Sequence, residues 1–118
     1  MGPCGLWGCS EPLALPICMS ATAEQLKCAR ATSASQWRED LILLPLLLQA
    51  AHSVAARGTF VELGALNGHT YSNTLMLERC FNFTGLLIEA NPHNFARLNS
   101  SRRAAAKVHW AFRASLRS

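Results

Sequence analysis

A turn bounded by two glycines, set between two apolar runs, constrains the fold of this chain more than any other feature. The run Thr59–Leu63 leads into Gly64–Gly68, and a second apolar run, Phe83–Ile88, follows after a helix-length segment. Short apolar runs bounded by turn residues are typical of strands that a parallel sheet buries. Between them, Thr70 or Ser72 can cap a helix with apolar contacts at Leu75, Met76, Leu77 and Cys80. The pattern predicts strand, glycine turn, helix and strand.

The segment after the second strand continues this alternation. Asn91 and Pro92 suit the N-cap and the first position of a helix, and Phe95 and Leu98 mark its inner face. The segment 107–112 alternates apolar and polar residues, as a third strand would. Strands that alternate with helices form parallel sheets through right-handed crossovers. We therefore expect an α/β fold with a parallel sheet of about three strands and flanking helices.

The first quarter of the chain has a different composition. Residues 1–32 are rich in Gly, Pro, Ala, Ser, Thr and Cys and show no periodicity, so we expect a flexible leader that can serve in targeting. Both a secretory and an organellar address stay open, because neither pattern is complete. The domain is then expected over 33–118. It begins with a capping box at Ser33 and Gln36 and a buried helix that Pro45 kinks or divides and Arg57-Gly58 ends.

Charge, cysteines and histidines exclude several kinds of site. The net charge is +4, and no acid follows Glu89, but the basic residues after it lack the interleaved aromatics of a nucleic-acid surface. We expect a solvated basic face and no nucleic-acid partner. Five cysteines in an odd count without a C-x-x-C pair favour inert thiols in a reducing compartment. Four histidines without ligand spacing predict no metal site. No apolar run reaches the roughly 20 residues of a membrane span.

The glycine turn and two acids predict the kind of ligand. A dinucleotide site has three glycines in G-x-G-x-x-G, whereas here Ala65, Leu66 and Asn67 stand between Gly64 and Gly68. This bulkier turn fits a ligand without a pyrophosphate, such as S-adenosylmethionine. Glu62 before the turn can receive an ammonium group, and Glu89 at the end of the next strand can accept ribose hydroxyls.

Three segments, Phe60–Thr74, Leu77–Arg79 and Thr84–Pro92, resemble the FkbM-type methyltransferase family. The resemblance covers residues 58–112. It implies a class I, Rossmann-like fold and S-adenosylmethionine-dependent methyl transfer, usually to an oxygen of a small molecule or sugar. It also implies that the following residues line the cofactor: Glu62, Gly64, Ala65, Asn67, Gly68, Ser72, Asn73 and Glu89. Ser72 and Asn73 have helix capping as an equal alternative role. No catalytic residue is indicated.

The family has further strands after the third, which are missing here. The resemblance therefore predicts an incomplete methyltransferase domain that is inactive alone, with the edge of strand 59–63 covered by a partner or by the missing C-terminal half. A non-catalytic remnant that depends on a partner is the alternative. An NAD-binding oxidoreductase fragment is a third possibility, which the missing middle glycine disfavours. The sequons Asn82-Phe-Thr84 and Asn99-Ser-Ser101 matter only if the chain is secreted.

Overall fold

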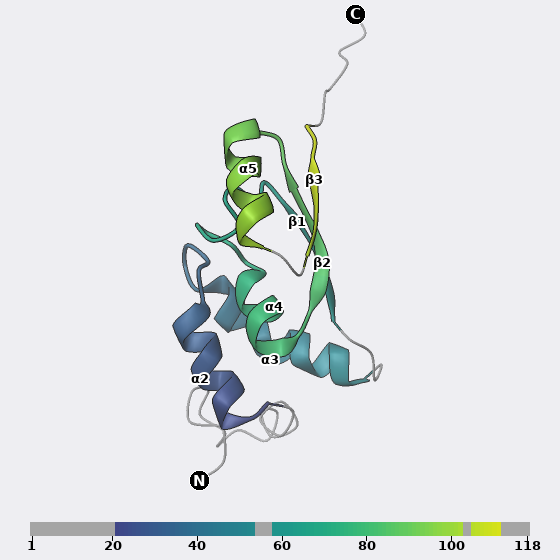
Figure 1. Ribbon diagram of the computed structural model, residues 1–118. Coiled ribbons are helices and arrows are strands. Elements are labelled where there is room, and N and C mark those ends of the chain that lie inside the picture. The colour runs from purple at the N-terminus through teal and green to yellow at the C-terminus, as the bar shows by residue number, and fades with distance from the viewer. Residues whose placement is uncertain (1–20, 54–57, 103–104, 112–118) are drawn as a thin grey trace, which may run out of the picture.

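The computed structural model describes residues 21–53, 58–102 and 105–111 (Figure 1). Its three strands form one parallel sheet in the order β1-β2-β3, with helices packed against it, which confirms the predicted α/β class. The strands are β1 (Thr59–Leu63), β2 (Thr84–Glu89) and β3 (Ala106–His109). The helices are α2 (Ala23–Thr32), α3 (Glu39–Ser53), α4 (Leu75–Phe81) and α5 (Pro92–Ser101).

The start of α5 follows directly from the sequence. The Asn91 side chain accepts hydrogen bonds from the backbone N–H groups of His93 at 2.9 Å and Asn94 at 3.2 Å, and Pro92 occupies the first turn. This satisfies two of the amides that a helix start leaves unpaired. Leu98 is fully buried and Phe95 half-buried, so the expected inner face is confirmed.

Helix α4 begins later than expected. Its N-cap is Thr74, whose side chain makes no capping bond, and the predicted cap at Thr70 is wrong. Ser72 is not the N-cap either, but its hydroxyl accepts hydrogen bonds from the backbone N–H groups of Leu75 at 3.1 Å and Thr74 at 3.3 Å. The residues between the glycine turn and α4 thus form an ordered polar loop rather than the first turn of a helix.

The expectation of a flexible leader through residue 32 is wrong for its last part. Thr22 and Gln25 form a reciprocal capping box, with N···O distances of 2.9 and 3.1 Å, which starts α2. Ala21, Leu26 and Ala29 are buried in the core. Residues 21–32 therefore belong to the folded domain, and the remainder of the expected leader lies outside the described residues.

Helix α3 also differs from its prediction. The capping box at Ser33 and Gln36 does not form, because Ser33 ends α2 and its hydroxyl donates to Asp40 at 2.7 Å. Asp40 accepts a second hydroxyl bond from Ser35, also at 2.7 Å, at the start of α3. Pro45 lies inside a single helix that continues to Ser53. The predicted end at 57–58 falls partly outside the described residues.

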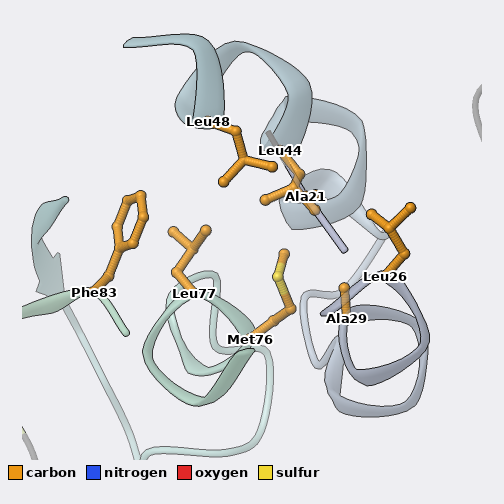
Figure 2. Packing of buried hydrophobic residues seen from close by; sticks show 8 residues of the cluster. All are labelled: Ala21, Leu26, Ala29, Leu44, Leu48, Met76, Leu77 and Phe83. Atoms are coloured by element: carbon orange, nitrogen blue, oxygen red, sulfur yellow. The ribbon is translucent and has the colours of Figure 1, made fainter. Parts of the chain in front are cut away.

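A hydrophobic cluster joins α2, α3 and α4 (Figure 2). Leu44 and Leu48 of α3 point toward Met76 and Leu77 of α4, and Phe83 closes the cluster at the start of β2. A second cluster packs α5 against the sheet through Ala65, Leu87, Leu98 and Ala105. The predicted buried helix is buried on one side only, through Leu44 and Leu48, whereas Ile42, Leu43 and Leu46 stay exposed.

Cys28 of α2 and Cys80 of α4 form a disulfide. The expectation of inert thiols is therefore wrong for this pair. The odd count and the absence of C-x-x-C were a poor guide, because the two cysteines are 52 positions apart in sequence and meet only when α2 packs on α4.

Among the described residues, one face of the sheet is covered and the other is open. In parallel pairs, residues in register share a face, and α5 covers the face that carries Leu87 and Glu89. The opposite face, here called the open face, carries the apolar residues Val61, Leu63, Leu86, Ile88 and Val108. Val61 and Leu63 are 65% and 62% exposed. Trp110, which follows β3, is half exposed.

No helix in the described part of the chain is both long and apolar enough to cross a membrane.

Candidate functional site

The glycine turn and Glu89 meet at the carboxyl ends of β1 and β2. Glu89 is buried, with 5% of the residue exposed. Its carboxylate accepts two backbone N–H bonds at 2.7 Å, one from Leu66 in the turn and one from Asn91 at the start of α5. The acid therefore connects the turn to the next helix. Its position at the ends of parallel strands is where open α/β sheets bind their ligands.

The first half of the turn is fastened to β2. The amides of Gly64 and Ala65 both donate to the carbonyl of Ile88, at 2.9 and 3.0 Å. Leu66 has a left-handed backbone, with φ of 50°, and its amide reaches Glu89. Such a conformation costs a branched side chain roughly 1–2 kcal/mol, so the surrounding bonds must hold it.

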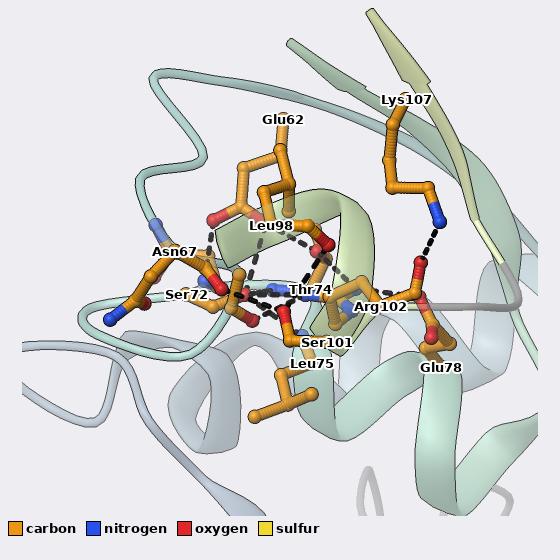
Figure 3. Close-up of polar contacts among 12 residues, drawn as sticks. Glu62, Asn67, Ser72, Thr74, Leu75, Glu78, Leu98, Ser101, Arg102 and Lys107 are labelled. Carbon is orange, nitrogen blue, oxygen red and sulfur yellow. Dashed lines mark hydrogen bonds and ion pairs between the residues drawn. The ribbon is translucent and has the colours of Figure 1, made fainter. Parts of the chain in front are cut away.

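Glu62 lies at the centre of the polar loop before α4 (Figure 3). One carboxylate oxygen accepts the Asn73 amide at 3.0 Å. The other accepts the hydroxyls of Ser72, at 3.0 Å, and Thr74. Glu62 therefore fixes the conformation of the loop and brings Ser72 and Asn73 together at the end of β1.

Arg102 is the principal residue that the sequence did not reveal. It is 1% exposed, and its guanidinium forms an ion pair with Glu78 at 2.7 Å. It also donates to the Gly68 carbonyl at 2.9 Å and to the hydroxyls of Ser72 and Thr74 at 3.1 and 3.2 Å. Figure 3 shows Arg102 beside Ser72, Thr74 and Glu78. The sequence offered only a basic residue after a helix, which we assigned to a solvated face, and this assignment is wrong for Arg102.

Asn67 shapes the second half of the turn. Its side-chain oxygen accepts the amides of His69 at 2.9 Å and Thr70 at 2.8 Å, and its side-chain nitrogen donates to the Thr70 hydroxyl at 3.0 Å. Its carbonyl accepts the Ser101 hydroxyl at 2.7 Å, which fastens the turn to α5. The side chain thus accepts the backbone amides two and three residues ahead, as asparagine often does in turns.

The two glycines of the turn have different environments. Gly64 has φ of 69°, and a Cβ built on it would meet no atom within 4 Å. Gly68 has φ of 85°, and a Cβ there would lie 2.5 Å from Cγ of Arg102 and 2.9 Å from a methyl of Leu98. Gly64 thus borders open space, where a ligand can approach, whereas Gly68 is required for packing against α5.

Gly68→Ala is expected to destabilise the protein by about 1–3 kcal/mol more than Gly64→Ala. Both substitutions carry the backbone cost of a left-handed alanine, roughly 1–2 kcal/mol. Only Gly68→Ala adds overpacking against α5, which typically costs about 1–3 kcal/mol. Urea unfolding of both variants measures the difference. Equal losses would contradict the assignment of Gly68 to packing.

His69 is half-buried directly after the Gly64–Gly68 turn. Burial lowers the pKa of His69 below its usual value of 6.5, and the nearby guanidiniums of Arg79 and Arg102 lower it further against the opposing charge of Glu78. Because the unfolded chain binds this proton more tightly, acidification through pH 6.5 favours unfolding.

The predicted site residues thus fall into two groups. Gly64 and Asn73 are exposed, and Glu62 and Asn67 are half-buried, so these four border the solvent. The others are buried: Ala65, Gly68, Ser72 and Glu89. In the described segments, no three side chains of the His, Cys, Asp and Glu types are placed to hold a metal ion.

Comparisons with protein-family models, with curated proteins and with solved structures find no match for this chain.

Proposed function

We propose that this chain carries the S-adenosylmethionine-binding part of a methyltransferase that acts on an oxygen of a small molecule or sugar. The observation that carries the proposal is the meeting of Glu62, the Gly64–Gly68 turn and Glu89 at the carboxyl ends of two adjacent parallel strands. The acceptor class rests on the resemblance to FkbM-type methyltransferases. Such enzymes need few reactive side chains, because placing the acceptor beside the methyl group supplies much of the rate.

The donors and acceptors at this edge fit the ligand. Each oxygen of Glu89 accepts one amide, and a carboxylate oxygen has a second lone pair that can accept a ribose hydroxyl. Glu62, half-buried and negatively charged, suits the ammonium of the methionine end. Gly64 leaves the space above the turn free for that end of the ligand.

The same turn is poorly suited to a dinucleotide. A pyrophosphate needs backbone N–H groups aimed at its oxygens. The amides of Gly64 and Ala65 are committed to Ile88, and the amide of Leu66 is committed to Glu89. Together with the missing middle glycine, this favours a ligand without phosphate over NAD.

Calorimetric titration of the full chain with S-adenosylmethionine tests the proposal. Gly64→Asn is the informative variant, because asparagine tolerates a left-handed backbone and its side chain would fill the space above the turn. We expect binding by the parent and at least a tenfold weaker affinity for Gly64→Asn and for Glu89→Gln. Arg97→Gln, on the exposed side of α5, is the matched control and should bind as the parent does.

Circular dichroism of each variant checks that the fold is retained. No binding by a folded parent would reject the cofactor assignment, and binding of NAD instead would support the dinucleotide alternative. Equal affinity of Gly64→Asn and the parent would place the ligand elsewhere.

The open face supports a second proposal, that the domain functions with an additional layer of structure. Parallel sheets are normally covered on both faces, because both carry apolar residues. Here Val61 and Leu63 are exposed on β1, which is also an edge strand with unpaired backbone groups along the described sheet. We propose that a partner, or further polypeptide of the same enzyme, covers the open face and the β1 edge.

Val61→Lys/Leu63→Lys should reduce self-association of the isolated chain, because charges on an exposed apolar strand oppose edge-to-edge pairing. Light scattering over a concentration series measures the effect. Thr59→Lys is the control, since it adds a charge to the same strand without removing apolar surface. A monomeric parent that binds no hydrophobic dye would contradict the proposal.

A further inference from the structure

The sequon at Asn82 is placed where a glycan can be attached and retained. Asn82 is exposed and forms the C-cap of α4 in the left-handed conformation, with φ of 58° and ψ of 29°. The next residue, Phe83, is 7% exposed and anchored in the core, and Thr84 begins β2. The segment therefore turns sharply at the surface, with Asn82 on the outside, which is where acceptor sequons of secreted proteins lie.

The disulfide supplies an independent observation about the compartment. Cys28 and Cys80 are bonded, and disulfides persist mainly in secreted proteins and in the lumen of the secretory pathway. N-glycans are attached in the same pathway. Cys80 and Asn82 are separated by one residue at the end of α4. One short segment therefore carries both a disulfide cysteine and a glycosylation sequon, the two features that indicate the secretory pathway.

From these two observations we propose that the chain enters the secretory pathway and that Asn82 carries an N-linked glycan there. The donor is an oligosaccharide linked through a diphosphate to a lipid. The side-chain nitrogen of Asn82 bonds to C1 of the first sugar, the bond from C1 to the diphosphate oxygen breaks, and the lipid diphosphate leaves with the electron pair. The proton lost by the amide passes to a base of the transferase.

A glycan at Asn82 leaves the proposed cofactor site open. Asn82 precedes the amino end of β2, whereas the Gly64–Gly68 turn follows the carboxyl end of β1. Because the two strands are parallel, these positions lie at opposite ends of the sheet. Asn99, in the second sequon, is also exposed but lies in α5 close to Ser101, which bonds the turn.

Translation of the full chain with vesicles from the endoplasmic reticulum tests the proposal. We expect a product protected from added protease, with a mass increase that peptide-N-glycosidase removes, leaving aspartate at position 82. Thr84→Ala and Asn82→Gln should lose this glycan. Thr84→Ser is the matched control and should keep it, because serine preserves the sequon.

Three outcomes would overturn the proposal. One is a chain that stays outside the vesicles. Another is a protected chain with the Cys28–Cys80 disulfide formed and Asn82 unmodified. The third is a glycan found on Asn99 alone. The cofactor titration is independent of all three, since it is made on the unglycosylated chain.

Discussion

Arg102→Met should lower the free energy of unfolding by about 3–5 kcal/mol. Removing one member of a buried ion pair leaves an uncompensated charge, here that of Glu78, and such losses are typically of this size. The side chains of Arg102 and Glu78 are 1% and 8% exposed, so water cannot replace the missing partner. The substitution also removes the donor to the buried carbonyl of Gly68 and to the hydroxyl of Ser72.

Loss of the Arg102 guanidinium should also disturb the polar loop that surrounds Glu62 in the proposed site. Arg102 bonds the hydroxyls of Ser72 and Thr74, which in turn donate to Glu62. Arg102→Lys should recover only part of the stability, because a single ammonium cannot reproduce the planar arrangement of donors that contacts Glu78, Gly68 and these hydroxyls.

Urea unfolding with a double-mutant cycle measures the contribution of the pair. Arg102→Met/Glu78→Leu should be more stable than Arg102→Met alone, because no unpaired charge remains. Arg97→Met, on the preceding helix α5, is the control and should change stability by less than about 0.5 kcal/mol, since Arg97 is exposed. A loss below about 1 kcal/mol for Arg102→Met would show that the guanidinium is not buried in solution.

Reducing the Cys28–Cys80 disulfide should lower the free energy of unfolding by about 4 kcal/mol. Cys28 and Cys80 are separated by 52 positions, and closing a loop of this length removes about that much entropy from the unfolded chain. The bond also fastens α2 to α4, whose packing forms much of the larger hydrophobic cluster. We expect α2 to be the first element to separate when the bond is reduced.

The measurement compares oxidised and reduced protein in a Cys4→Ser/Cys9→Ser/Cys18→Ser background, which prevents exchange with the other cysteines. Cys28→Ser/Cys80→Ser in the same background should match the reduced protein. Hydrogen exchange should show lost protection in α2 before the sheet. Identical unfolding curves for the oxidised and reduced forms would mean that the two sulfurs are not bonded in solution.

Several features of the fold could be predicted because they depend on neighbours in sequence. The apolar runs at 59–63 and 83–88 became β1 and β2 with at most a one-residue shift. Asn91 and Pro92 started α5, because a helix N-cap needs only the amides two and three residues ahead. The turn between Gly64 and Gly68 likewise has left-handed φ at both glycines.

Predictions from local sequence patterns were wrong where contacts with other parts of the fold determine the structure of a segment. The region 21–32 lacks a strong apolar stripe, so it resembled a leader. The capping box of Thr22 and Gln25 is a local signal for the start of α2, but it is packing against α3 and α4 that holds the helix in the fold. In the same way, Ser33 could have capped a helix, but its hydroxyl is bound by Asp40.

The sequence by itself determined the alternation of strands and helices and the placement of two acids around a glycine turn. These depend on backbone sterics, hydrogen bonding between near neighbours and the period of apolar residues. The tertiary structure alone decided that Arg102 is buried against Glu78, that Cys28 meets Cys80, and that one apolar face of the sheet stays open. Each of these joins or separates residues far apart in the chain, and no local pattern encodes which distant surfaces will pack together.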